Sequence, residues 1–272
     1  AAPCVMREIG RLRELTFRSV GEGSGKPRDI DRYDQDYLQL VLWDSTDLEI
    51  AGAYRIGEAH KLMQNKGLDG LYSSTLFNFG EATLPYLEEG LELGRSFVQQ
   101  RYQDRNSLDY LWYGIGAFVS KYPDYRYLFG PASLSPLYGR QGISRIVLYY
   151  STYYDKPELE AVSKNPFVID PQDAREMAQA FSGIDQEADF QALKDALAEQ
   201  GLPVPTLYKH YARAMLPGGV SFTAFNIDHD FGDCVDSLVM ADMTMLKPKK
   251  RHRYLGEGSD NGGTKTGRQD RV

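Results

Sequence analysis

A short acidic segment of this chain has the composition of a charged site. Asp29-Ile30-Asp31-Arg32-Tyr33-Asp34 places three carboxylates within six residues. Carboxylates this close repel one another, so each needs a cationic substrate, an arginine or solvent beside it. A solvated loop explains the segment equally well on its own. Arg55 and Arg95 favour a charged site over a solvated loop, because each lies in an apolar stretch where an unpaired charge is costly and so needs a carboxylate.

The second group of candidate residues lies in the apolar stretch LELGRSFV at 91–98. Side chains alternate along a strand, so Glu92 is expected on the face of Gly94 and Ser96, with Arg95 on the opposite face. A glutamate beside a glycine leaves room for a ligand to lie against the backbone. A structural ion pair is the alternative interpretation for Glu92 and for Arg95, and it is favoured when either residue is taken alone.

Several other motifs are incomplete. GEGSGK at 21–26 resembles a phosphate-binding loop, but it is one residue short between the glycines and Pro27 follows its lysine, so a flexible polar loop is predicted. His229 lies among three aspartates, and a turn between two strands is the better interpretation than a cation site. The chain lacks a GxSxG motif and any Cys/His spacing typical of zinc ligands. We therefore expect neither a hydrolase triad nor a bound metal or cofactor.

Composition limits the cellular setting and the partners. The net charge of −7 argues against nucleic acid as the main partner. Cys4 and Cys234 are far apart in the chain, which favours a reducing compartment. The sequence contains neither an apolar run of membrane-spanning length nor a signal peptide at its first residues. A cytoplasmic protein is expected.

The elements that must position these residues follow from hydrophobic periodicity. Apolar spacing predicts helices over 7–18, 107–122 and 136–151, and two charged, alanine-rich helices within 171–200. Strands are expected at 36–44, 49–56, 91–98, 125–130, 220–228 and 235–243, the first two as a hairpin. Alternating strands and helices predict an α/β fold whose sheet is covered by helices on both faces. The helical pair is interpreted as an insertion at about 156–201, and the basic, glycine-rich residues 247–272 as a disordered tail.

In this order of motifs the chain resembles the GNAT-related N-acyltransferases that make N-acyl amino acids and lyso-ornithine or lyso-glycine lipids, often labelled "putative hemolysin". It resembles the acyl-homoserine lactone synthases more distantly. The matching residues are Arg13 and Phe17 in R-x-x-x-F, Asp29, Asp31, Tyr33 and Asp34 in the acidic loop, Gly52 and Arg55 in G-x-x-R, and Glu92, Leu93, Arg95 and Ser96 in E-L-x-R-S. The resemblance covers about residues 5–246 and implies a single GNAT-like domain, 1–246, with a mixed sheet.

The resemblance implies transfer of a long-chain fatty acyl group, plain or 3-hydroxylated, to the amine of an amino acid such as ornithine or glycine. It implies Glu92 as general base, with Arg95 and Ser96 completing the catalytic set. The residues implied to bind the acceptor are Arg13, Phe17, Asp31, Asp34 and Arg55. The residues implied to hold the pantetheine and the acyl chain are Phe97, Val98 and Trp112, with a backbone N–H near Phe97 or Val98 as oxyanion donor.

One departure from the family bears on the donor. Acetyl-CoA-dependent members carry a glycine-rich turn after this strand, whose N–H groups hold the pyrophosphate. Here the segment reads QQRYQDRNS and has no glycine. Acyl carrier protein is thus the expected donor, with acyl-CoA as the alternative.

Two partners and two rival functions complete the expectations. The basic residues Lys247, Lys249, Lys250, Arg251 and Arg253 suit contact with the acidic carrier protein or with an anionic inner membrane, and a solvated linker is an equal alternative. The rival functions are lactone synthesis, which needs an adenosylmethionine site, and a non-catalytic acyl-carrier- or lipid-binding protein.

Overall fold

The computed structural model describes residues 2–103 and 106–256. Its strands are β1 (Leu38–Asp44), β2 (Glu49–Glu58), β3 (Phe77–Phe79), β4 (Gly90–Val98), β5 (Tyr127–Leu134), β6 (Ala161–Ser163), β7 (Val220–Asp228) and β8 (Cys234–Asp242). Its helices are α1 (Pro3–Arg18), α2 (Ala59–Lys66), α3 (Leu84–Glu88), α4 (Ser107–Lys121), α5 (Gly139–Tyr154), α6 (Pro171–Ala180), α7 (Gln186–Ala198), α8 (Thr206–Ala214) and α9 (Pro248–Leu255).

The main sheet has six strands in the order β1-β2-β4-β5-β8-β7. Neighbouring strands are antiparallel except β4 and β5, which run parallel. A separate small sheet pairs β3 with β6. The predicted mixed α/β fold is therefore confirmed, and so is the hairpin of β1 and β2.

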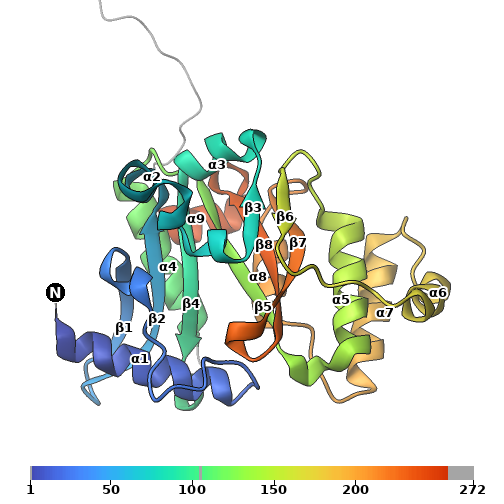
Figure 1. The fold of residues 1–272 in the computed structure, drawn as a ribbon, viewed down its shortest axis with the longest axis horizontal. Coiled ribbons are helices and arrows are strands. Elements are labelled where there is room, and N and C mark those ends of the chain that lie inside the picture. Colours follow the sequence, from blue (N-terminus) through green and yellow to red (C-terminus); the bar gives the residue numbers. More distant parts are fainter. Residues whose placement is uncertain (1, 104–105, 257–272) are drawn as a thin grey trace, which may run out of the picture.

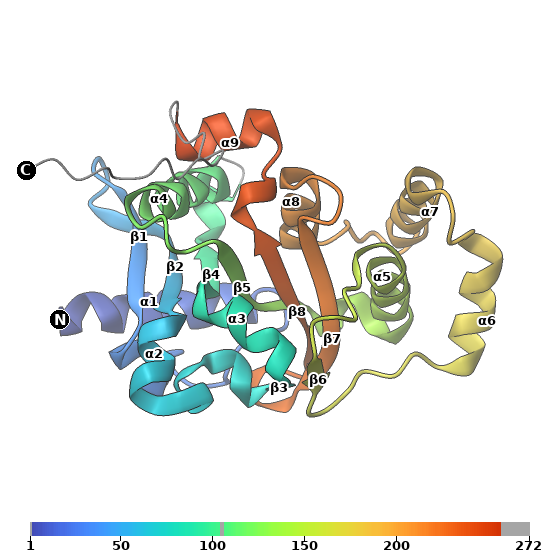
Figure 2. The ribbon, with the colours of Figure 1, turned by 90° about the horizontal axis from the view of Figure 1, so that it is seen from above.

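Helices cover both faces of the main sheet, as predicted. Figure 1 and Figure 2 show α1, α2 and α3 on one face, with α1 crossing the end of β4. Helices α4, α8 and α9 lie on the opposite face, where α4 packs against β1 and β2. α5 packs against β7, and α7 packs on α5. Apolar side chains of α4, α5, α7 and α8 merge with those of the sheet into one large core.

The edge between β4 and β5 opens partway along the two strands. Their register runs from Gly90 opposite Tyr127 to Glu92 opposite Phe129 and then stops. Gly130, with φ 148°, stands where the strands part, and a side chain there would collide with the carbonyl oxygen of Leu93. The rest of β4 and β5 is separated by an opening in the sheet.

A β-bulge in β4 lies beside this opening. Ala53 of β2 stands opposite Phe97, whereas Arg55 stands opposite Gly94, so β4 carries one extra residue. Arg95 absorbs it in the left-handed region with φ 50°. The bulge shifts the alternation by one residue, so Arg95 and Glu92 both contact Tyr72 on the same face. The expectation that they lie on opposite faces is wrong, because strict alternation holds only for an unbulged strand.

The C-terminal residues and the segment after α7 also differ from expectation. Residues 248–255 form α9, whose Tyr254 is buried against α4, so the disordered tail predicted from 247 is wrong for this stretch. The buried Tyr254 side chain holds this helix on α4, and the prediction from the basic composition of the segment did not take it into account. The predicted tail beyond 256 lies outside the described residues. Helix α8 was not expected, and the predicted insertion contains β6 as well as the helical pair α6 and α7.

Candidate active site

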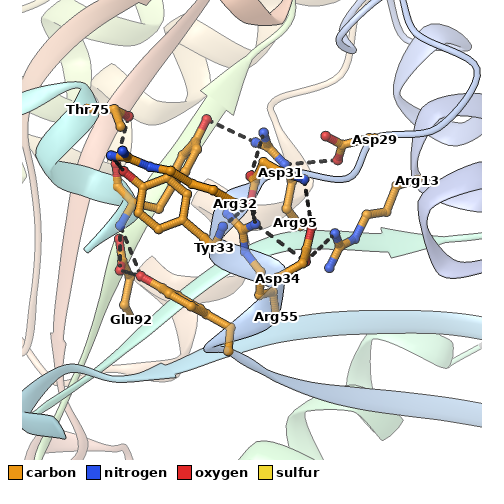
Figure 3. Close-up of polar contacts among 12 residues, drawn as sticks. Arg13, Asp29, Asp31, Arg32, Tyr33, Asp34, Arg55, Thr75, Glu92 and Arg95 are labelled. Carbon is orange, nitrogen blue, oxygen red and sulfur yellow. Dashed lines mark hydrogen bonds and ion pairs between the residues drawn. The ribbon is translucent and has the colours of Figure 1, made fainter. Parts of the chain in front are cut away.

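Three arginines and three aspartates form a buried ion network at one end of the main sheet (Figure 3). The aspartates come from the loop before β1, where Asp31 caps the short 3-10 helix η1 (Arg32–Gln35). Each arginine comes from a different element. Arg13 of α1 donates to Asp34 at 2.9 Å, Arg55 of β2 donates to both oxygens of Asp31 at 2.7 Å, and the Arg95 side chain of β4 lies 2.9 Å from Asp29. The network thus joins α1, β2 and β4 through the acidic loop.

Burial makes these pairs obligatory. Arg13 and Arg55 are at most 1% exposed, and a buried guanidinium without a carboxylate would cost several kcal/mol. Burial by itself would raise the pKa of Asp31, but the positive charges of Arg55 and Arg95 outweigh it, and the pKa is lowered. Asp29 differs, because its burial outweighs Arg95 and raises its pKa. The structure thus pairs all three arginines with carboxylates of the acidic loop.

Glu92 lies at the centre of a second set of hydrogen bonds. Its carboxylate accepts from the Tyr37 hydroxyl, from the backbone N–H of Tyr72 at 3.0 Å, and from both the backbone N–H and the hydroxyl of Ser73. Tyr72 and Ser73 begin the 3-10 helix η3 (Tyr72–Thr75), so Glu92 fixes this helix over β4. Glu92 is 1% exposed, and the expectation that it faces an open side with Gly94 and Ser96 is wrong.

The opening between β4 and β5 contains a cavity of about 440 Å³. This size suits a small-molecule ligand. From the α1 face it is lined by Phe17 and Val20, and from the opposite face by Leu108 of α4 and Leu207 of α8. The cavity therefore runs through the plane of the sheet, and its wall in between is the bulged segment of β4.

The predicted site residues fall into two groups around this cavity. Those that line it are Phe17, Arg95, Ser96, Phe97 and Val98. Those not among its lining residues, in the described part of the chain, are Arg13, Asp31, Asp34, Arg55, Glu92 and Trp112. Trp112 was predicted to bind the acyl chain or pantetheine. It is instead fully buried behind the cavity wall and packs against His210, Tyr211 and Tyr254.

Two carboxylates that line the cavity were not predicted. Burial raises the pKa of Glu22 to about 7. Burial, reinforced by the charges of Asp228 and Glu22, raises the pKa of Asp236 well above its usual range. The sequence signal for Asp236 was an acid within the apolar strand VDSLVMADM. Glu22 had no such signal, because it lies in GEGSGK, which was interpreted as a flexible loop.

That loop is ordered by a carboxylate from α1. Glu14 accepts hydrogen bonds from the backbone N–H of Ser24 at 3.1 Å, from the Ser24 hydroxyl at 2.7 Å and from the N–H of Gly25 at 2.9 Å. Gly21, Gly23 and Gly25 all have φ between 74° and 108°. The glycine-rich loop therefore wraps an anion, as a phosphate loop does, but the anion is the protein's own glutamate.

The described residues hold no group of three or more His, Cys, Asp or Glu side chains placed to bind a metal ion. No helix within 2–103 and 106–256 is both long and apolar enough to cross a membrane.

The mixed sheet, the bulged β4 and the cavity at the open β4–β5 edge define an acyltransferase of the GNAT class. Residues 12–113 match the family model described as "Acetyltransferase (GNAT) domain". Over 267 residues the chain is 32% identical to "Glycine N(alpha)-acyltransferase" of Bacteroides thetaiotaomicron, covering 93% of this chain and 78% of that protein. The protein of the same name in Phocaeicola vulgatus is also 32% identical over 93% of this chain and 81% of its own length. The chain belongs to the family that these acyltransferases represent.

Two other similarities are narrower. "L-ornithine N(alpha)-acyltransferase" of Brucella abortus is 30% identical over 128 residues, which is 42% of this chain and 45% of that protein. A solved CoA-dependent acyl-homoserine lactone synthase, with SAM and isopentyl-CoA, is 12% identical over 70% of this chain and 92% of its own chain, with a TM-score of 0.34.

The ion network gives a stability prediction with a matched control on the same helix. Arg13→Met removes the nearer of the two guanidinium groups beside the buried Asp34 carboxylate and leaves Arg55 at 3.5 Å, so we expect a loss of about 3 kcal/mol in the free energy of unfolding, at the lower end for a broken buried pair. Arg11→Met removes an exposed pair with Glu8 and should cost less than about 1 kcal/mol. Urea denaturation of the two variants measures the difference. Equal losses would contradict the network's structural role.

Glu92 gives a second stability prediction. In Glu92→Gln the amide nitrogen cannot accept a hydrogen bond, so at least one of its buried donors loses its partner, at a cost of about 1–3 kcal/mol. Glu88→Gln, on the exposed side of α3, is the control and should leave the unfolding midpoint unchanged. A Glu92→Gln protein as stable as wild type would show that these hydrogen bonds contribute little.

Proposed function

We propose that this protein transfers a long-chain fatty acyl group from a carrier-protein thioester to the amine of an amino acid such as glycine or ornithine. One observation carries the proposal: the cavity at the open β4–β5 edge joins apolar walls to ionisable groups. Its lining includes Phe17, Leu108 and Leu207 as well as Arg95 and Glu22. A fatty thioester and a charged amine both find complementary surfaces there. The names of the two glycine N(alpha)-acyltransferases support an amino acid as acceptor.

The bulge in β4 is the proposed place of reaction. Residues 95 and 96 have no paired residue in β2, so their backbone N–H groups lie outside the sheet register, next to the cavity. Such an N–H can donate to the oxyanion of the tetrahedral intermediate, and removal of one such donor typically costs a factor of about 10²–10³. We propose this segment, slightly before the predicted Phe97 or Val98, as the oxyanion site.

The chemistry needs few parts. The amine nitrogen attacks the thioester carbonyl carbon, a C–N bond forms, and the C–S bond breaks. The amine enters as an ammonium and loses two protons, one to a base and one to the departing thiolate. The predicted base, Glu92, has its carboxylate surrounded by donors and does not line the cavity. We therefore assign Glu92 the role of holding η3 over β4.

The acidic loop and its arginines serve the same purpose in this proposal. Arg13, Asp31, Asp34 and Arg55 do not line the cavity, so they act by holding the β4 bulge in place through Arg95. Arg95 lines the cavity and belongs to the network. Among the predicted acceptor-binding residues, Phe17 contacts the cavity directly.

Carrier protein as donor is supported by two features. The segment between β4 and α4 has no glycine, so it lacks the turn that holds a coenzyme A pyrophosphate. The basic helix α9 also packs against α4, and Arg253 pairs with Asp109 in the first turn of α4. Ser107 and Leu108 of that turn line the cavity, so α9 brings basic residues near this part of the cavity wall. We propose α9 as the contact for the acidic carrier protein, with an anionic membrane surface as the alternative.

A product assay tests the function directly. Purified protein is incubated with a long-chain acyl-carrier-protein or acyl-CoA and with glycine or ornithine, and products are identified by mass spectrometry. An N-acyl amino acid made faster from the carrier thioester is the expected result. A lactone formed with adenosylmethionine would support the rival synthase, and absence of thiol release with every pair would support a non-catalytic binding protein.

The same assay tests the position of the donor. Val98→Trp narrows the cavity at the end of β4, so we expect kcat/KM for the thioester to fall at least about tenfold because the donor no longer fits. Val162→Trp places the same side chain on the exposed β6 and should leave turnover unchanged. Unaltered kinetics in Val98→Trp would exclude the cavity as the donor site.

A further inference from the structure

We propose that the ammonium group of the acceptor binds between Asp236 and Glu22 in the cavity wall, and that Glu22 removes the proton that frees the amine for attack. Neither carboxylate belongs to a motif that carries the resemblance, and both lie beyond the acidic loop. The inference rests on the proposed function and names the acceptor subsite within it.

Asp236 is the first observation behind this proposal. It is 5% exposed, it lies in the middle of β8, and it lines the cavity. The hydrogen bond described for its carboxylate comes from the Cys234 thiol at 3.7 Å, and a thiol is a weak donor. Buried carboxylates in proteins are normally paired with a cation or several good donors. A buried carboxylate that has a weak donor among the described residues and lines a cavity is placed to receive a cation from outside the protein.

Glu22 is held in the same cavity wall by contacts of the glycine-rich loop on both sides of it. The Glu14 carboxylate holds the loop at Ser24 and Gly25, on one side of Glu22. On the other side, Gly232 packs so closely that a side chain there would lie 2.9 Å from the Gly21 carbonyl oxygen and 3.3 Å from the Glu22 Cα. The loop is therefore fixed against the turn between β7 and β8, and Glu22 is half-buried and lines the cavity.

The charges of the lining favour a cationic ligand. Among the described residues that line the cavity, Glu22 and Asp236 are the acids and Arg95 is the cation. Arg95 already faces Asp29 at 2.9 Å and Asp31 at 3.7 Å, so its charge is largely compensated. Asp228 adds further negative charge beside Asp236. The ammonium group of an amino acid fits this excess of negative charge, with Glu22 and Asp236 as its partners.

Glu22 is suited to proton removal by its surroundings. The groups that face it are Arg95 of β4, Asp236 and Cys234 of β8, Tyr138 before α5, and the Ser133 hydroxyl of β5. Burial is the largest influence and raises the pKa of Glu22 to about 7, despite Ser133 and Arg95. A general base whose pKa is near the pH of the reaction is deprotonated in about half of the molecules and is still basic enough to accept a proton. Glu22 takes one proton from the ammonium, the neutral nitrogen attacks, and the second proton leaves with the thiol.

Asp236→Asn tests the binding half of the proposal. We expect KM for the amino acid to rise at least tenfold, while KM for the acyl thioester changes less than twofold. Asp233→Asn, an exposed aspartate paired with His229 in the preceding turn, is the control and should change neither constant. Equal KM values for the amino acid in Asp236→Asn and wild type would overturn the proposal.

The unfolding midpoint of Asp236→Asn shows whether weaker acceptor binding results from the lost carboxylate or from a destabilised fold. Because the folded-state pKa of Asp236 is raised, its ionisation destabilises the folded protein as pH increases above the unfolded value near 4. Removal of this charge should therefore raise the midpoint at pH 8 while acceptor binding weakens. A fall in the midpoint would show that Asp236 supports the fold, and would overturn its role as an acceptor site.

Glu22→Gln tests the proton-transfer half. We expect kcat to fall by about 10²–10⁴. Wild-type kcat should rise as pH increases through about 7, where Glu22 loses its proton, and this rise should disappear in Glu22→Gln. Glu8→Gln, an exposed glutamate of α1, is the control and should retain the wild-type pH profile. A Glu22→Gln enzyme that keeps both kcat and the rise would overturn Glu22 as the base.

These measurements separate the two levels of inference. Wild-type protein that acylates no amino acid refutes the proposed function and the acceptor subsite with it. Wild-type protein that acylates amino acids, together with Asp236→Asn and Glu22→Gln variants of unchanged kinetics, refutes only the subsite. In that case Glu92→Gln, which should lower stability more than kcat under the present proposal, becomes the variant expected to lose turnover.

Discussion

The burial of three arginines against one acidic loop is the constraint on which the rest of the structure depends. Arg13, Arg55 and Arg95 come from a helix and two strands, and none can be buried without its carboxylate. The acidic loop must therefore lie where the three elements meet. Ion pairs of this kind bring little net stability compared with apolar packing, but they tolerate only one arrangement. Their effect here is to fix the position of the acidic loop relative to α1, β2 and β4.

That geometry fixes the open edge of the sheet. Arg95 adopts a left-handed backbone conformation that costs a non-glycine residue about 1–3 kcal/mol and persists only when its surroundings hold it. Asp29 and Tyr72 hold its side chain, and Glu92 holds Tyr72 in turn. The bulge turns β4 away from β5, and the cavity occupies the space between them. The ion network, most of which lies outside the cavity, thus holds open the gap between β4 and β5 that the cavity occupies.

The cavity itself contains groups that a stable fold would avoid. Asp236 is buried, and within the described part of the chain its carboxylate accepts a hydrogen bond from the Cys234 thiol. Glu22 is kept beside it by a loop that wraps Glu14. Both carboxylates have raised pKa values because burial disfavours their charged forms. Perturbed ionisable groups in a cavity are typical of sites where ligands bind and protons move. Their cost is offset elsewhere, in the large apolar core that α4, α5 and α8 share with the sheet.

The sequence by itself determined the six strands of the main sheet, most of the helices around them, the hairpin of β1 and β2, and the pairing of Arg55 and Arg95 with the acidic loop. Those features follow from local periodicity and from the cost of an unpaired buried charge, and both can be read from residue types. The bulge at Arg95 depends on how β4 pairs with β2, which alternation along one strand cannot reveal. Glu22 and Asp236 are 214 positions apart in the chain and meet because Gly232 admits the loop after α1. Only the tertiary structure decides which carboxylates are paired and which face the cavity, because burial and charge are set by distant neighbours.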